Sequence, residues 1–191
     1  MRAEYENVLD DHLGQIHFTY VNTWDELLPA HWHEHLEIIY VLGGEITASI
    51  NDVSYELKKG DIFLVNSNDI HYTHTHEDAR YYLLQIPPVH LERISAKWEG
   101  LKFQEFIRSK SADACVQGEQ LENVQGKGLV EMRENRKSTN RADDLYDQLR
   151  DVFRKIAGFY EEKKEGYHLL VLSAVYRLLY FLSVSYTHLT L

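Results

Sequence analysis

The chain has 191 residues, with 20 basic and 30 acidic side chains, and therefore a formal net charge of −10. Its hydrophobic fraction of 44% and aromatic fraction of 12% exclude a disordered chain. A single cysteine, Cys115, excludes an intramolecular disulfide and a multi-cysteine zinc module, and it indicates a reducing compartment. Since the first residues contain no apolar secretory core, we expect a cytoplasmic protein, and its acidic balance predicts poor DNA binding by itself.

The acidic excess lies in the first half of the chain. Residues 1–89 hold 4 basic and 15 acidic side chains, a net of −11, whereas residues 90–191 hold 16 and 15, a net of +1. Six of the 11 histidines lie between positions 31 and 76. Two regions of different chemistry therefore share the chain.

Residues 17–95 carry the pattern of a β-sandwich. Residues 36–42 form a run rich in β-branched and aromatic side chains that ends at a glycine pair, and residues 45–50 alternate apolar and polar side chains. Asn51-Asp52 predicts a two-residue hairpin turn. Because such turn signals recur at roughly 8–12 residue spacing, we expect a mainly β sandwich or barrel here.

Residues 143–184 change to a helical period. Apolar residues recur every three or four positions from Leu145 to Phe159, which predicts an amphipathic helix. After a break at Gly166, residues 167–184 are apolar almost all round, so the two segments predict an antiparallel hairpin. Arg177 argues against a membrane span, because a central arginine costs about 2.5–3.5 kcal/mol on insertion scales.

The chemically suggestive residues are three histidines and one glutamate. Residues two apart on an extended segment point to one face, so His31, His33 and Glu37 can aim into the sandwich. An inward His71 could meet them there. Three imidazoles and one carboxylate suit a divalent ion such as Mn, Fe, Ni or Zn, but they could equally bind a polar ligand or water with no metal. Three further histidines are expected to be solvated in a turn or a polar loop: His35, His74 and His76.

Two motifs resemble those of the cupin proteins. The first is H-x-H-x3-E-x6-G, which begins at His31. The second is G-x5-N-x-N-x2-H, which begins at Gly60 and has asparagine at the two positions where proline and glycine are usual. More narrowly, the sensor domain of AraC-family transcriptional regulators is similar to the run HWHEHLEIIYVLGGEITASINDVSYELKKGDIFLVNSNDIHY. The helices of that family are similar to YDQLRDVFRKIAGFYEEKKEGYHLLVLSAVYRLLYFL.

The resemblance implies a cupin-like double-stranded β-helix over residues 17–95 that binds a small effector, often a sugar, and a helical hairpin over residues 143–184 that forms a homodimer. It implies an N-terminal arm over residues 1–16, either a mobile lid or a frayed terminus, and we expect an irregular connector over residues 96–142. Effector contacts in the family come from inward residues, and strand parity selects a set that includes the candidate metal ligands: His31, His33, Glu37, Tyr55, His71, Thr73 and Tyr82.

The family carries a helix-turn-helix domain after the hairpin, whereas only seven residues follow Val184 here. Residues 185–191 resemble translated sequencing adapter, so we expect a non-native tail on a truncated chain that reaches DNA only through the missing domain. We therefore expect the sensing and dimerising module of a regulator, which is not an enzyme and requires no cofactor. The alternative is a metal-dependent cupin enzyme, a dioxygenase or a sugar isomerase, that uses the three histidines and Glu37.

Overall fold

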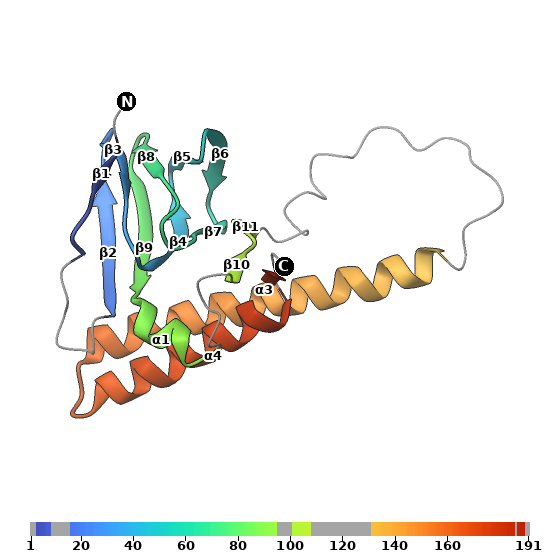
Figure 1. Ribbon diagram of the computed structural model, residues 1–191. Coiled ribbons are helices and arrows are strands. Elements are labelled where there is room, and N and C mark those ends of the chain that lie inside the picture. Colours follow the sequence, from blue (N-terminus) through green and yellow to red (C-terminus); the bar gives the residue numbers. More distant parts are fainter. Residues whose placement is uncertain (1–2, 9–15, 95–100, 108–130, 186, 190–191) are drawn as a thin grey trace, which may run out of the picture.

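Two β-sheets lie face to face, and two long helices run along the outer surface of one of them (Figure 1). The computed structural model describes residues 3–8, 16–94, 101–107, 131–185 and 187–189. For residues 101, 131–145, 185 and 187–189 it describes the backbone alone. The architecture is a cupin-like double-stranded β-helix followed by a helical hairpin, as the sequence predicts.

Each main sheet contains five strands. The first, sheet A, has in spatial order β1 (Glu4–Tyr5), β3 (Leu27–Trp32), β8 (His71–Thr75), β5 (Glu45–Ile50) and β6 (Val53–Lys58). The second, sheet B, has β11 (Phe106–Ile107), β7 (Ile62–Val65), β4 (Leu36–Gly43), β9 (Ala79–Ile86) and β2 (His17–Thr23). The pairs within each sheet are antiparallel except β1 with β3. A separate pair joins β10 (Leu101–Phe103) to β12 (Thr187–Leu189).

The tight turns use residues that tolerate positive φ. Asn51 and Asp52, at φ 47° and 70°, make the predicted hairpin turn between β5 and β6. Asn68 has φ 66°, which explains why asparagine can replace the usual glycine of the second motif. Asn66, where proline is usual, pairs with the backbone of Phe103 through both its amide nitrogen (3.2 Å) and its oxygen (2.8 Å). This asparagine therefore attaches β10 to the end of β7.

Two apolar cores lie on the two faces of sheet B. Inward residues of the two sheets form the sandwich core, which includes Ile39 and Val41 from sheet B and Ala48 and Ile50 from sheet A. The alternate residues of β4, such as Ile38, face outward into a larger core made with the helices. Sheet B is thus buried on both faces at β4 and β7, which explains why these two strands are apolar almost continuously.

The helices are α1 (Pro88–Glu92), α3 (Glu131–Glu162) and α4 (Tyr167–Ser185). The predicted apolar stripe of α3 is buried: Leu149, Val152, Phe153 and Ile156 are at most 2% exposed. Phe153 lies 5.5 Å from the ring of Tyr40 on β4, centroid to centroid. The hairpin therefore shares a core with the sandwich and covers the outer face of sheet B.

The prediction of an irregular connector over residues 96–142 is wrong where the structure describes it. Residues 101–107 contain two short strands, and α3 begins at Glu131, 12 positions before the predicted start at 143. The segment 131–142 lacks glycine and proline and is rich in good helix formers, but it is polar all round and shows no amphipathic period. Residues 95–100 and 108–130 lie outside the described residues.

Helix α4 has one buried and one exposed face. The stretch Tyr167–Val184 is long and apolar enough to cross a membrane by length and composition alone, with a mean hydropathy of 1.5. However, Val171, Val175 and Leu178 are fully buried against α3 and sheet B. A soluble core helix passes the same hydropathy criterion, so the packed face accounts for much of this composition.

Candidate ligand-binding site

Three imidazoles converge at one end of the sandwich. His31 is the second-last residue of β3, and His33 follows directly after that strand. His71 is the first residue of β8 and is paired with His31 in the strand register. Each ring offers a nitrogen within 4.8 Å of the nitrogens of the other two. His33 and His71 are each only 1% exposed. The predicted convergence of these three residues is therefore present in the structure.

Each of the three rings is oriented by a nearby backbone carbonyl oxygen. The Nδ1 atom of His31 is 2.8 Å from the Pro29 oxygen, that of His33 is 3.2 Å from the His35 oxygen, and that of His71 is 3.0 Å from the Asp69 oxygen. A carbonyl oxygen only accepts, so Nδ1 carries the proton and donates in each case. Nε2 is thereby turned toward the cluster, an orientation that supporting hydrogen bonds give to metal-ligating histidines.

Glu37 supplies a buried carboxylate beside the imidazoles. It lies on β4 and is 5% exposed. Its Oε2 accepts hydrogen bonds from His33 Nε2 (3.1 Å) and from Gln85 Nε2 (2.9 Å), and its Oε1 lies 3.9 Å from His71 Nε2. Because His33 donates through both ring nitrogens, it is the imidazolium partner of this carboxylate.

The buried charges shift the pKa values in opposite directions. Burial disfavours the carboxylate of Glu37, but the hydrogen bond from His33 and the attraction to the neighbouring imidazoles in their protonated forms outweigh it and lower its pKa to about 2. Burial also disfavours charged His33, but the hydrogen bond and the charge of Glu37 raise its pKa above 6.5. Burial dominates at His71 and lowers its pKa. Without a further ligand, the cluster therefore holds one buried ion pair and a neutral His71.

The N-terminal arm lies against this cluster. β1 pairs with β3 in parallel, and the ring of Tyr5 packs 4.8 Å from that of Trp32. The next residue, Glu6, places its Oε2 3.5 Å from His31 Nε2 and 3.9 Å from His33 Nε2. The described part of the arm thus carries a second carboxylate to the imidazoles from the solvent side.

One ring nitrogen of the cluster, Nε2 of His71, has no hydrogen-bond partner among the described residues. This atom is buried. A pocket of about 510 Å3 lies next to this histidine; its wall includes Ala3 of the arm and residues of β3 and of the β5–β6 turn, but not His31, His33 or Glu37. The cluster thus contains one unused buried nitrogen, which is available to a further ligand.

The other three predicted contact residues lie in different places. Thr73 is 4% exposed and shares the inward face of β8 with His71. Tyr55 also faces the sandwich core, but its hydroxyl donates to Glu105 at 2.5 Å, which raises its pKa to about 12. The prediction that Tyr82 faces inward is wrong, because its ring packs against Phe18 on the helix-covered side of sheet B. On β9 the inward residues are Tyr81, Leu83 and Gln85 instead.

The structure adds two residues to the predicted set and corrects one further expectation. Gln85 was detectable as the one polar residue in the apolar second half of β9. Glu6 had no local signal, because the arm is attached through backbone pairing. His74 and His76 are not simply solvated, since they contact Asp25 Oδ1 (2.9 Å) and Thr47 Oγ1 (2.8 Å) respectively.

Comparison with known proteins places the chain in a family. A family model described as the AraC-like ligand binding domain matches residues 14–179. The chain belongs to the AraC-like ligand-binding domain family. Membership confirms the resemblance to the sensor domain of AraC-family regulators that the sequence motifs and the helical segments indicate.

One curated protein that is similar in sequence to this AraC-like domain is a transcriptional regulator. An uncharacterized HTH-type transcriptional regulator, YdeC of Bacillus subtilis, is 30% identical over 63 residues, which are 32% of this chain and 22% of the relative. The chain therefore matches only a minor part of that relative's length.

Solved cupin structures also resemble this AraC-like domain, at low identity. An RmlC-like cupin from Shewanella frigidimarina is 20% identical with a TM-score of 0.36, covering 38% of this chain and 66% of that one. KdgF from Halomonas sp. is 23% identical with a TM-score of 0.36, covering 38% and 69%. A predicted oxalate decarboxylase from Thermotoga maritima is 21% identical with a TM-score of 0.34, covering 39% and 66%.

The donors of the site fit a divalent metal ion. Three Nε2 atoms are available as ligands, because the Nδ1 atoms of His31, His33 and His71 already donate to backbone carbonyl oxygens. Glu37 offers a carboxylate next to them. This donor set suits borderline ions such as Zn, Ni, Fe or Mn. A bound ion would supply Lewis-acid chemistry and would replace the proton on His33 Nε2.

Proposed function

We propose that this domain is the effector-sensing and dimerising module of an AraC-type transcription regulator, and that it binds its effector at the histidine cluster. The observation that carries the proposal is the arm-covered cluster of His31, His33, His71 and Glu37 at the end of a sandwich that belongs to a ligand-binding family. Two further inward polar side chains come from opposite sheets: Thr73 from β8 in sheet A and Gln85 from β9 in sheet B.

The chemistry of the cluster favours a polar effector with several hydroxyl groups or a carboxylate. The carboxylate of Glu6 already faces the imidazoles of His31 and His33 from the arm. A small molecule that offers equivalent oxygens could take this place, and hydrogen bonds to charged groups are about twice as strong as neutral ones. We therefore propose a sugar or a related metabolite, with sugar acids as the best-matched members.

Sensing follows if the effector competes with Glu6 or bridges to it. In the first case the effector releases β1 from β3, and in the second it holds the arm more tightly. Either change alters the relative stability of two arm positions, which is the physical requirement for a switch. The hairpin then passes the change to the second subunit and to a DNA-binding domain in the whole protein.

A thermal-shift panel of monosaccharides, disaccharides, uronic acids and aldonic acids tests the binding claim. At least one class is expected to raise the melting temperature, since a ligand that binds only the folded state stabilises it by mass action. The gain should vanish in His71→Ala and persist in the exposed control variant His168→Ala. If no compound on the panel stabilises the protein, the sensing proposal fails.

The second candidate is a metal-dependent cupin enzyme, a dioxygenase or a sugar isomerase. The observation in its favour is the shared orientation of three imidazoles with Nε2 toward one point and a carboxylate beside them. Metal analysis of the purified chain separates the two proposals. Sub-stoichiometric metal that does not change in Glu37→Ala or His71→Ala contradicts the enzyme.

A further inference from the structure

A second group of metal-ligating side chains lies at the other end of β8. His74 and His76 are two positions apart, so their side chains leave the strand on the same side, and their ring centroids are 4.5 Å apart. Asp25, in the turn between β2 and β3, places its Oδ1 2.9 Å from His74 Nε2. Each of the three residues offers a ligand atom within 4.8 Å of the other two.

The backbone next to these side chains is held in place by hydrogen bonds. Thr75, which lies between the two histidines, donates its N–H to the Glu26 carbonyl oxygen at 2.9 Å. Its hydroxyl oxygen accepts the N–H of Glu26 at 3.0 Å. Because Glu26 follows Asp25 directly, these bonds fix the aspartate opposite both imidazoles before any ligand binds. Such prior ordering lowers the entropy that binding must supply.

The ring of His76 is oriented by a neighbouring strand. Its Nε2 lies 2.8 Å from the hydroxyl of Thr47 on β5, and the same hydroxyl lies 3.1 Å from Glu56 Oε1 on β6. Hydrogen-bonded groups behind a ligating imidazole are typical of metal sites, where they set the ring orientation. The cluster therefore has supporting contacts from both sides of β8.

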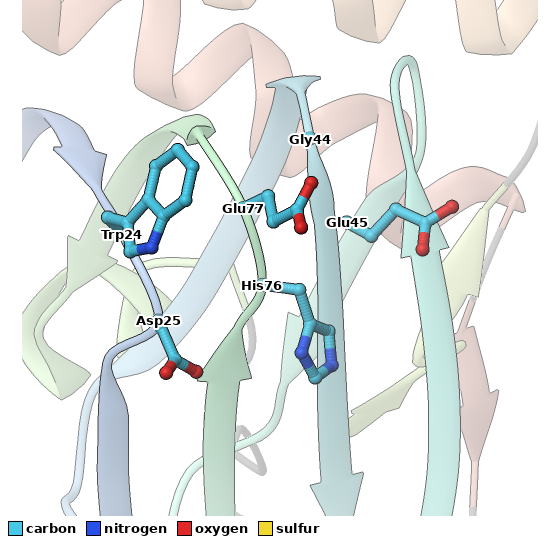
Figure 2. A pocket seen from close by; sticks show the side chains of 6 residues that line it. All are labelled: Trp24, Asp25, Gly44, Glu45, His76 and Glu77. Atoms are coloured by element: carbon cyan, nitrogen blue, oxygen red, sulfur yellow. The ribbon is translucent and has the colours of Figure 1, made fainter.

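An open pocket adjoins the cluster. Figure 2 shows Asp25 and His76 on its wall, with the carboxylates of Glu45 and Glu77 nearby. The pocket has a volume of about 700 Å3, and the side chains of His74 and Asp25 are 36% and 68% exposed. An ion held here would keep a coordination position open to water or to an exogenous ligand.

We propose that Asp25, His74 and His76 form a second divalent-metal site, separate from the effector site and independent of the proposed sensing function. Two imidazoles and one carboxylate favour Zn2+ and similar borderline ions over Mg2+ or Ca2+, which prefer oxygen ligands only. The donors meet on the outside of sheet A, whereas the effector cluster faces the interior at the opposite end of β8.

Zinc titration of the chelator-treated full chain tests the site. His74→Ala/His76→Ala is expected to bind one equivalent of Zn2+ fewer than the wild type, by calorimetry and by elemental analysis. Asp25→Asn keeps the shape of the side chain and removes its charge. It should lower the Zn2+ affinity of this site by at least about tenfold, since removing even a residue that only supports a ligand typically costs about 10–100-fold. The control His168→Ala changes an exposed histidine on α4 and should behave as the wild type.

The two clusters can be separated in the same experiment. His31→Ala/His71→Ala removes donors of the effector cluster and should leave the Asp25 site intact, whatever metal the effector cluster binds. Because the substituted groups of the second site lie at the surface, the metal-free melting temperature should stay close to that of the wild type. Zinc stoichiometry and affinity that are unchanged in His74→Ala/His76→Ala overturn the proposal.

Discussion

At the scale of single residues, the ion pair between Glu37 and His33 controls the chemistry of the cluster. The period-two spacing predicted that His33 and Glu37 share the inward face, but not that they form an ion pair. It could not predict Glu6, which reaches the site through backbone pairing of β1 with β3. Such pairing leaves no mark in the side-chain pattern of a short arm.

The Glu37→Gln variant should lower the unfolding free energy of the metal-free protein most strongly between pH 4.5 and 6.5. The lowered pKa of Glu37, about 2, gives stability that is present above its unfolded value of 4.5 and is lost as pH falls toward 2. The raised pKa of His33 gives stability that is present below 6.5 and is lost as pH rises through its folded value. Breaking such a buried pair costs about 3–5 kcal/mol.

Urea unfolding of both proteins across pH, with chelator present, measures this difference. The exposed substitution Glu45→Gln serves as the control and should cost well under about 1 kcal/mol, because exposed ion pairs contribute little. A Glu37→Gln effect that is constant from pH 3 to pH 9 contradicts the assigned ion pair.

At the scale of elements, the alternation of β9 shows what sequence parity can and cannot decide. Sheet A has one side exposed, so its polar–apolar alternation gives the inward face directly. Sheet B is buried on both faces, by the sandwich core and by α3 and α4. On β9 the apolar residues therefore alternate between two cores, and Tyr82 was assigned to the wrong one. Gln85 lies on the opposite face of β9 from Tyr82. It is the only amide on that strand and marks the inward face.

Two glycines predict opposite effects of the same substitution. Gly44 has φ +73°, and a Cβ there would lie 2.7 Å from backbone atoms of Asp78 and Ala79. Gly44→Ala should therefore lower the unfolding free energy by about 2 kcal/mol or more. Gly158 lies within α3, where an added Cβ meets no atom within 4 Å, so Gly158→Ala should raise it by about 0.5–1 kcal/mol.

Thermal and urea unfolding of the two variants give the comparison directly. The helical substitution is the control for the general effect of adding a methyl group. Equal effects of the two variants, in either direction, contradict the close approach of the turn after β4 to the start of β9.

At the scale of the whole molecule, the exposed face of α4 is the surface at which we expect a second subunit to pack. Leu169, Leu170, Tyr180 and Val184 are each at least 50% exposed although the opposite face of the helix is fully buried. An apolar stripe of this kind on a soluble domain indicates an interaction surface. The sequence predicted both faces from the apolar composition, but not which residues each face would contain, because that depends on the angle at which α4 meets sheet B.

The double substitution Leu169→Glu/Leu170→Glu should convert a dimer into a monomer, since two carboxylates per subunit would have to be buried at the interface. Val53→Glu places one carboxylate on an exposed apolar residue of β6, away from the hairpin, and should leave the dimer intact. Light scattering at high micromolar concentration reads the mass of each protein. A wild-type protein that is strictly monomeric at that concentration contradicts dimerisation through the hairpin.

The central claim is that the cluster of His31, His33, His71 and Glu37 binds the effector beneath the arm. Calorimetric titration of the best stabilising compound from the panel into the wild type, Glu37→Gln and His74→Ala tests it most directly. We expect Glu37→Gln to lose at least about tenfold in affinity, equivalent to about 1.4 kcal/mol, and His74→Ala to bind as the wild type does. Full affinity in Glu37→Gln together with a loss in His74→Ala would contradict it.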